Sequence, residues 1–268
     1  AEIDRGAAQS DGMVGIEISV ETLVDDKDRH IELRYRPLGV VGIITPWNAP
    51  VNLALGPLVS ALYTGNTVVL KPSPYTPLTT LKVGELIKDV FPAGVVNVLA
   101  GGDDLGRLMT EHRDIDKISF TGSVATGKKV LASAAGTLKR VTLELGGNDP
   151  AIILDDVDPK AIAKKVFFAS FVNSGQDCMA IKHIYAHEKI YDGLCAALAA
   201  EAKKAKVGDG LDPGTELGPL QNKMQYDKVV DLINDTKKSG GKFLAGGDVP
   251  HGPGYFLPPT LVTDIPDV

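Results

Sequence analysis

Between residues 39 and 145 the chain alternates short apolar runs with segments of helical pattern, and this alternation constrains the fold more than any other feature. The runs have the length and the unbroken apolar character of strands buried on both faces of a sheet. They cover residues 39–45, 67–70, 95–99, 117–120 and 141–145. With short connections between them, they predict an α/β fold built on a doubly wound, mostly parallel sheet.

The segments between these runs predict the helices of that fold. Thr76 is the expected N-cap of one of them, because Pro77 suits the first helical position. This helix is expected to run to about Val90, and the others are expected at 51–63, near 105–110 and at 123–135. Before the sheet, alternating apolar and polar residues at 16–24 and 31–35 predict a β-hairpin.

A second α/β unit is predicted after Gly146 and Gly147. Its expected strands are 151–154 and 181–186, and its expected helices are 159–171, 190–205 and 221–239. The Gly- and Pro-rich remainder is expected to hold one more strand, at 260–262. The last residues, up to Val268, show no capping pattern, so a fragment or a truncated gene product is expected.

Composition excludes several classes of partner. A net charge of −6 and a pI near 5.4 argue against nucleic acid or an anionic membrane as the main partner. The apolar runs are too short and too interrupted to span a membrane. The 2 cysteines lack the spacing of a metal site or a disulfide scaffold, so no metal is expected and a reducing, cytoplasmic compartment fits.

Polar residues follow the predicted strands at the edge where parallel sheets bind ligands. They are Asn48, Lys71, the Gly122–Ser123 turn and Glu144. Two of them also have a structural reading: the turn can be an ordinary strand-to-helix connection, and Glu144 can be a paired carboxylate at a buried strand end. The spacing from Gly122 to Lys128 is nearly that of a P-loop, but Lys129 stands where Ser or Thr is needed.

Two cysteines have different predicted surroundings. Cys178 ends the loop 173–178 between an apolar helix and an apolar strand, where a thiol can face a cleft. A buried cysteine more often acts as a small hydrophobe, so both readings stay open for Cys178. Cys195 lies among alanines and leucines inside a predicted helix and is interpreted as packing.

Five motifs in order carry a family resemblance. They are Pro46-Trp47-Asn48, Lys71-Pro72-Ser73, Phe120-Thr121-Gly122-Ser123, Glu144-Leu145-Gly146-Gly147-Asn148 and Gly175-Gln176-x-Cys178. The set resembles the NAD(P)-dependent aldehyde dehydrogenase superfamily over nearly the whole chain, although the chain is shorter than the family at both ends. The resemblance implies an N-terminal segment (1–16), a protruding oligomerisation hairpin (17–36), a Rossmann-like NAD(P)-binding domain (37–146) and a partial catalytic domain (147–268).

The resemblance also implies residue roles. Cys178 is the implied nucleophile, Asn48 an oxyanion donor and Glu144 the base that activates water. NAD or NADP is the implied cofactor, an aldehyde the substrate, and a homo-oligomer (dimer or tetramer) the assembly. The implied cofactor-binding residues are Thr45, Pro46, Trp47, Lys71, Ser73, Gly102, Gly106, Phe120, Thr121, Gly122, Ser123, Leu145 and Gly146.

Three departures from the family pattern matter. Pro74 replaces a glutamate that binds the cofactor's ribose in many members, so both NAD and NADP are expected to fit. Asp177 precedes the nucleophile, where an apolar or small residue is usual. Family members also continue well past Thr263. Two alternatives therefore stand beside the dehydrogenase: a nucleotide-binding remnant without turnover, and a cofactor-independent thiol esterase that uses Cys178.

Overall fold

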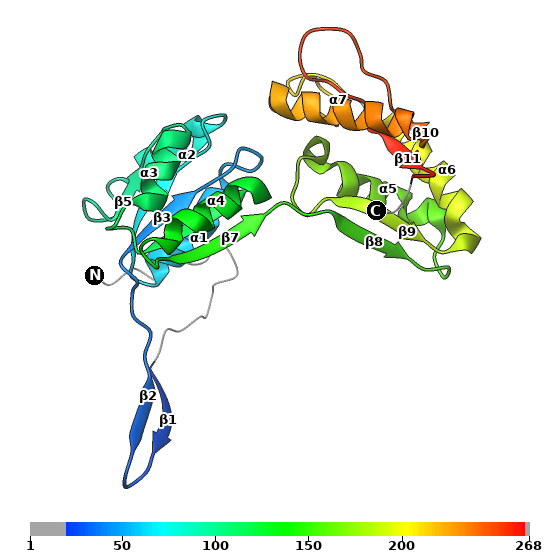
Figure 1. Ribbon diagram of the computed structural model, residues 1–268. Coiled ribbons are helices and arrows are strands. Elements are labelled where there is room, and N and C mark those ends of the chain that lie inside the picture. The colour runs from blue at the N-terminus through cyan, green and yellow to red at the C-terminus, as the bar shows by residue number, and fades with distance from the viewer. Residues whose placement is uncertain (1–19, 266–268) are drawn as a thin grey trace. The chain divides into compact units, whose positions relative to one another are not determined.

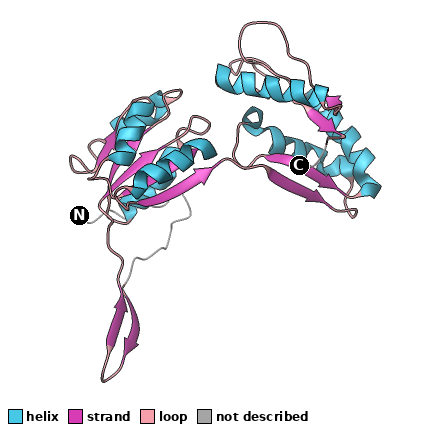
Figure 2. Ribbon diagram, in the orientation of Figure 1, coloured by secondary structure: helices cyan, strands magenta, loops and turns pink. Residues whose placement is uncertain are grey.

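The computed structural model describes residues 20–265, and the chain divides into two compact units between Leu145 and Gly146 (Figure 1). Each unit combines strands and helices, so the predicted α/β class is confirmed (Figure 2). In the first unit, five parallel strands form one sheet in the order β5-β4-β3-β6-β7. These strands are β3 (Val40–Ile44), β4 (Thr67–Lys71), β5 (Val96–Val98), β6 (Lys117–Gly122) and β7 (Arg140–Leu145).

Helices cover the two faces of this sheet, as a doubly wound fold requires. The four helices are α1 (Asn52–Tyr63), α2 (Pro77–Ile87), α3 (Asp103–Glu111) and α4 (Val124–Ala135). Helix α1 packs on β3 and β4, and Ile87 of α2 joins the same core. On the other face, Met109 of α3 and Val130 of α4 pack against Ile118 and Phe120 of β6.

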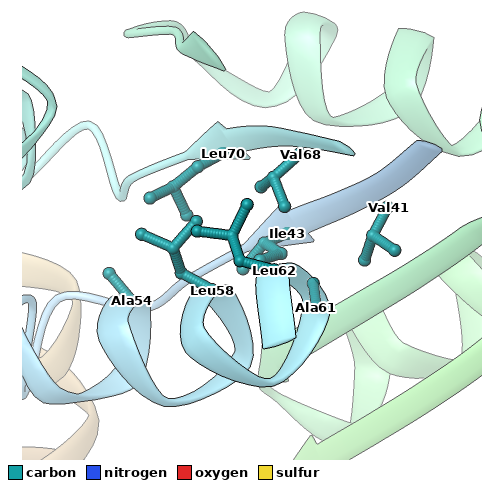
Figure 3. Packing of buried hydrophobic residues seen from close by; sticks show 8 residues of the cluster. All are labelled: Val41, Ile43, Ala54, Leu58, Ala61, Leu62, Val68 and Leu70. Atoms are coloured by element: carbon teal, nitrogen blue, oxygen red, sulfur yellow. The ribbon is translucent and has the colours of Figure 1, made fainter. Parts of the chain in front are cut away.

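The core under α1 shows how this packing fixes the sheet. Figure 3 shows four side chains of α1 that face four side chains of β3 and β4. Ile43, Leu58, Val68 and Leu70 are each at most 2% exposed. Burying a side chain of this size contributes roughly 1.5–3 kcal/mol. The strands are therefore held firmly, and so are the carboxyl ends that carry the polar residues.

A β-hairpin precedes the sheet. It consists of β1 (Glu21–Asp25) and β2 (His30–Leu33), which pair antiparallel. Its turn is closed by Asp26, whose Oδ1 accepts hydrogen bonds from the N–H groups of Asp28 and Arg29 at 2.9 and 2.8 Å. The hairpin was predicted to begin at residue 16, but residues 16–19 lie outside the described part of the chain.

Over residues 146–265 the second unit contains two small sheets. Strands β8 (Asp149–Ile153) and β9 (Ile181–Ala186) pair in parallel, and β10 (Lys242–Ala245) pairs antiparallel with β11 (Leu261–Thr263). The helices are α5 (Pro159–Phe171), α6 (Glu188–Lys204) and α7 (Lys223–Lys238), with a short 3-10 turn, η2 (Val172–Gly175), after α5. Leu194 and Leu198 of α6 pack against Ala163 and Val166 of α5.

Several sequence predictions differ from the structure. Strand β10 was missed, because its four residues lie between glycine pairs and show no clear alternation. Helix α7 begins at Lys223 and not at Gln221, because the Asn222 side chain caps it by accepting a hydrogen bond from the Gln225 N–H. Thr76 is the N-cap of α2 and Pro77 its first residue, as predicted, but the Thr76 hydroxyl donates to the Trp47 carbonyl at 3.4 Å and forms no cap bond.

The ends of the other elements also shift. Helix α2 ends at Ile87, short of the predicted end near Val90. Helix α3 begins at Asp103 and is thus longer than the predicted segment near 105–110, because two aspartates in its first turn suit a helix N-terminus.

Candidate active site

The sheet of the first unit brings the polar residues predicted there to one rim. In the register of the sheet, Ile44 lies beside both Lys71 and Phe120, and Thr121 lies beside Glu144. The Thr45 N–H donates to the Lys71 carbonyl at 3.1 Å. Thr45, Lys71, the Phe120–Ser123 segment and Glu144 therefore share the carboxyl edge of adjacent strands, where open parallel sheets bind ligands.

Thr45 carries an unsatisfied hydroxyl at this rim. The residue is 5% exposed, and its Oγ1 has no hydrogen-bond partner among the described residues. Leaving a buried hydroxyl unpaired costs about 1–3 kcal/mol. A ligand that bonds to Thr45 would recover this cost.

Lys71 is the buried cation of the rim. It is 3% exposed, and its Nζ donates to the Pro72 carbonyl at 3.3 Å. Burial lowers the pKa of Lys71, and the Asp103 carboxylate at the start of α3 offsets part of that effect. Gly106, also on α3, lies close to the Lys71 side chain: a Cβ added at Gly106 would be 3.8 Å from the Lys71 Cε. A lysine with a single carbonyl partner has donors left for a ligand.

The turn from β6 to α4 has the geometry of an anion-binding helix start. A Cβ at Gly122 would lie 2.5 Å from the Phe120 ring, so only glycine fits there without movement of a buried side chain. Ser123 is the N-cap of α4: its Oγ accepts from the Thr126 N–H at 3.2 Å and donates to the Thr126 Oγ1 at 3.0 Å. Helix starts of this kind bind phosphate groups.

The remaining predicted cofactor residues lie on the loops that follow the strands. Pro46, Trp47 and Asn48 follow β3 directly and are half-buried. Ser73 is buried after β4, and its Oγ accepts from the Tyr75 N–H at 3.3 Å. Gly102 is the N-cap of α3, with open space where a Cβ would stand. Leu145 and Gly146 stand where the two units divide.

Glu144 differs from the prediction. The sequence placed it at the end of a buried strand, but β7 is the edge strand of the sheet and Glu144 is exposed. The error has a physical cause: Val141, Leu143 and Leu145 pack on one face of β7, whereas the alternate residues face a hollow of about 810 Å³. Residues that line this hollow from β6 and β7 are Lys117, Ser119, Thr121, Arg140, Thr142 and Glu144.

The turn before Cys178 has an unusual backbone. Asn173, Ser174 and Gly175 all have positive φ angles, of 52°, 57° and 77°. Left-handed residues other than glycine are strained and gather at functional sites. Two long-range hydrogen bonds hold the turn: Ser174 Oγ donates to the Gly218 carbonyl at 2.8 Å, and the Gln221 N–H donates to Gln176 Oε1 at 2.8 Å.

Cys178 itself is exposed on the loop between η2 and β9. Its backbone N–H has no partner within residues 20–265. Gly147 packs against this loop, because an added Cβ would lie 2.9 Å from the Cys178 carbonyl oxygen and would also collide with the Asp149 carboxylate. Gly147 thus allows the chain after β7 to lie close to the Cys178 turn.

Three residues of these sites were not identified from the sequence. Asp103 approaches Lys71 only because α3 packs beside β4, and Ser174 shows its left-handed conformation only in the fold. The third is Lys182, whose ammonium Nζ donates to the carbonyls of Asp177 and Ala180 at 3.0 and 2.9 Å. The sequence signal for this contact is a lysine four residues after a loop cysteine.

Cys195 is the less reactive of the two thiols. It is half-buried on α6 and hydrogen-bonded to Tyr191. Burial raises the pKa of the Cys195 thiol, and the Tyr191 hydrogen bond opposes that shift in part. Cys195 therefore stays protonated at neutral pH. Among the described residues, no group of His, Cys, Asp and Glu could hold a metal ion, and no described helix has the length and apolar composition to cross a membrane.

Fold and site together define an α/β protein with a polar rim on a parallel sheet and an exposed cysteine in a strained turn. The sequence signature of the Aldehyde dehydrogenase family matches residues 7–268, and the chain belongs to this family. It is 47% identical over 86% of its length to a probable aldehyde dehydrogenase of Pseudomonas sp. It is 41% identical over 97% of its length to the chloroplastic betaine aldehyde dehydrogenase of Beta vulgaris.

Solved structures agree with these relatives. The NAD+ complex of aldehyde dehydrogenase from Bacillus cereus superposes with a TM-score of 0.90 at 41% identity, and the match covers 94% of this chain and 52% of that one. Betaine aldehyde dehydrogenase from Staphylococcus aureus, solved with NAD+, gives a TM-score of 0.87 at 35% identity over 92% of this chain and 50% of that one. The two relatives in sequence are covered over 47% and 52% of their lengths, so the chain spans about half of each protein that it matches.

Proposed function

We propose that the chain carries the chemistry of aldehyde oxidation, in which an aldehyde, water and NAD(P)+ give a carboxylic acid, NAD(P)H and a proton. The observation that carries the proposal is the Cys178 turn, which presents an exposed thiol and an unpaired backbone N–H at one residue. A thiolate adds to an aldehyde carbonyl, and the oxygen of the adduct gains negative charge. The backbone N–H of Cys178 belongs to the same residue as the thiol, so it can donate a hydrogen bond to this negatively charged oxygen.

The other catalytic roles follow from the family resemblance. The Asn48 amide would be the second oxyanion donor, and one such donor contributes about 3 kcal/mol to transition-state stabilisation. Glu144 would take a proton from the water that hydrolyses the thioester on Cys178.

The rim of the first unit fits a nicotinamide dinucleotide. When bound, the cofactor supplies the hydride acceptor of the reaction. The buried, unpaired Thr45 hydroxyl and the partly satisfied Lys71 ammonium would hold its ribose region, and the start of α4 at Ser123 would hold its pyrophosphate. The relatives from Bacillus cereus and Staphylococcus aureus were solved with NAD+.

We further propose that NAD and NADP both fit this rim. Pro74 provides no carboxylate to repel a 2′-phosphate, and the Ser73 hydroxyl keeps its hydrogen for donation while its oxygen accepts from Tyr75. Dissociation constants for the two cofactors, measured by calorimetry, are expected to agree within about tenfold. A strong preference for NAD would contradict this expectation.

The experiment that tests the dehydrogenase is NAD(P)H formation by the purified chain over a panel of aldehydes. Cys178→Ala is expected to abolish the signal, and Cys195→Ala is the matched control that removes the other thiol and keeps it. If the unaltered chain binds the cofactor but forms no NAD(P)H, the proposed dehydrogenase activity is refuted. The chain would then be a nucleotide-binding remnant without turnover.

One observation favours a second candidate. The Cys178 thiol and its N–H both belong to the second unit, and a thiol with an oxyanion donor can cleave activated esters without a cofactor. Ester hydrolysis that Cys178→Ala removes and that NAD+ leaves unchanged, without aldehyde oxidation, would favour this thiol esterase.

Assembly and compartment complete the proposal. Leu23 and Ile31 of the hairpin are 54% and 42% exposed, which fits burial of the hairpin against another subunit of a homo-oligomer. The 2 free cysteines fit the reducing environment of the cytoplasm.

A further inference from the structure

A β-bulge places Lys182 next to the Cys178 turn. Along the parallel pair β8–β9, Asp149 lies opposite Ile181 and Pro150 lies opposite His183. Lys182 is therefore an extra residue on β9 with no opposite residue on β8. Pro150 has no backbone N–H to offer to the ladder, which favours a bulge at this point. Bulges change the direction of a side chain and are frequent beside active sites.

The redirected side chain closes the turn that carries Cys178. Lys182 Nζ donates to the Asp177 carbonyl at 3.0 Å and to the Ala180 carbonyl at 2.9 Å, one on each side of Cys178 and Met179. A third hydrogen bond comes from the Asp177 carboxylate, whose Oδ1 accepts from the Met179 N–H at 2.9 Å. These bonds use the carbonyls around Cys178 and leave its N–H unpaired.

The same two hydrogen bonds bring the positive charge of Lys182 to the turn that carries Cys178. Within residues 20–265, Lys182 forms no ion pair, so no carboxylate neutralises its ammonium directly. Asp177 in the same turn carries the opposite charge. The other titratable groups around the turn are Asp149 at the start of β8 and His183 on β9. A nearby cation favours a thiolate, and a nearby carboxylate disfavours it.

We propose that Lys182 is a positioning residue for the nucleophile: its ammonium holds the Asp177–Ala180 turn so that the Cys178 N–H stays unpaired, and its charge offsets Asp177 in favour of the thiolate. The inference rests on the proposed role of Cys178 as nucleophile. It adds to that role a residue that neither the sequence motifs nor the similarity to relatives identifies.

Three substitutions separate the two effects of Lys182. Lys182→Met removes both the charge and the donors, Lys182→Gln removes the charge and keeps an amide donor, and Lys182→Arg keeps both. Lys164→Met is the matched control, because Lys164 is an exposed lysine of α5 in the same unit and its side chain has no partner among residues 20–265. All variants carry Cys195→Ala, so that Cys178 is the single thiol.

The measurement is the pH dependence of alkylation of Cys178 by iodoacetamide. Lys182→Met is expected to move the midpoint of this profile to higher pH and to slow alkylation at pH 7 by about 3- to 10-fold, because one pH unit in the midpoint changes the thiolate fraction about tenfold. Lys182→Arg is expected to stay within about twofold of the parent, whereas Lys182→Gln shifts the midpoint upward. Hydrogen exchange at the Met179 and Ala180 amides is expected to be faster in Lys182→Met.

An alkylation profile of Lys182→Met equal to that of Lys164→Met would overturn the proposal. If Lys182→Met does not fold, as judged by circular dichroism, the comparison of Lys182→Gln with Lys182→Arg decides, and equal midpoints for these two contradict the electrostatic role. Alkylation needs neither aldehyde nor cofactor. A Lys182 effect without NAD(P)H formation would remove the proposed function alone, and NAD(P)H formation without a Lys182 effect would remove this inference alone.

Discussion

At the scale of single residues, Asp177 places a carboxylate directly before Cys178 in the chain. Its carboxylate folds back over the Cys178 peptide to bind the Met179 N–H at 2.9 Å. We expect Asp177→Val to raise the rate of Cys178 alkylation at pH 7 several-fold in a Cys195→Ala background, because a negative charge beside a thiol disfavours the thiolate.

Asp177→Asn is the control for this prediction. The amide oxygen still accepts from the Met179 N–H, so this variant removes the charge and keeps the turn. A faster rate in both variants assigns the effect to charge, and a faster rate in Asp177→Val alone assigns it to loosening of the turn. Unchanged rates in both would show that the Asp177 carboxylate has no influence on Cys178.

Lys71 gives a second prediction, which concerns stability and pH. Burial lowers the pKa of Lys71 below the ordinary value of 10.5, so the native chain releases this proton more readily than the unfolded chain does. Between the lowered native pKa and 10.5, the unfolded state therefore binds more protons than the native state. The cost of burying the charged lysine disappears over this range, so the stability of the native chain rises with pH. Lys71→Met removes the titrating group. The free energy of unfolding of this variant is therefore expected to rise less with increasing alkaline pH than that of the parent.

Urea unfolding of the parent and of Lys71→Met between pH 7 and 10 measures this difference. At pH 7 the methionine variant is expected to be as stable as the parent within about 1 kcal/mol, or more stable, because an apolar side chain of similar size avoids the cost of a buried charge. Parallel pH curves for the two proteins would contradict the prediction.

At the scale of elements, the first sheet could be predicted from the sequence because its central strands β3, β4 and β6 are largely buried and its strands are apolar runs separated by helical segments. The carboxyl rim followed from that topology, so Lys71 and the Gly122–Ser123 turn were predicted to lie together, whereas Thr45 was named only through the family resemblance. Strand β10 was missed because it is short and pairs with β11 across an intervening Gly- and Pro-rich loop. The pattern of apolar and polar residues within β10 does not indicate that β11 is its partner strand.

The Cys178 turn marks the limit of prediction at this scale. Its motif identified the cysteine, but its shape depends on contacts distant in sequence, such as Ser174 with Gly218 and Gln176 with Gln221. The bulge that directs Lys182 to the turn depends on the register of β8 against β9. Only the fold brings these residues together.

The connection between β6 and α4 gives a prediction about an element. Gly122→Ala is expected to destabilise the chain by about 1–3 kcal/mol, because the new methyl group would press on the buried Phe120 ring at 2.5 Å. Gly136→Ala, after the same helix, is the control and is expected to change stability by less than about 0.5 kcal/mol, since its nearest neighbour would lie at 3.6 Å. Thermal unfolding measures both, and equal melting temperatures would refute the steric account.

At the scale of the whole molecule, the catalytic residues implied by the family are distributed over both units. Asn48, Lys71 and Glu144 belong to the unit that ends at Leu145, and Cys178 belongs to the unit that starts at Gly146. Each unit has its own buried cluster, so each has a physical basis for holding its part of the chemistry. The proposed dehydrogenase needs both parts, whereas cofactor binding needs the first alone and thiol chemistry the second alone.

Assembly gives the last prediction. Among the described residues the hairpin sheet consists of β1 and β2, and a two-stranded hairpin is marginal in water unless another surface covers it. Its exposed Leu23 and Ile31 provide apolar area for a second subunit. Ile31→Glu is therefore expected to lower the mass of the native assembly measured by light scattering. Leu211→Glu is the control: Leu211 is 91% exposed on a loop of the second unit, and this variant is expected to keep the parental mass. Equal masses for the parent and Ile31→Glu would show that the hairpin does not hold subunits together, and a monomeric parent would contradict the expected homo-oligomer itself.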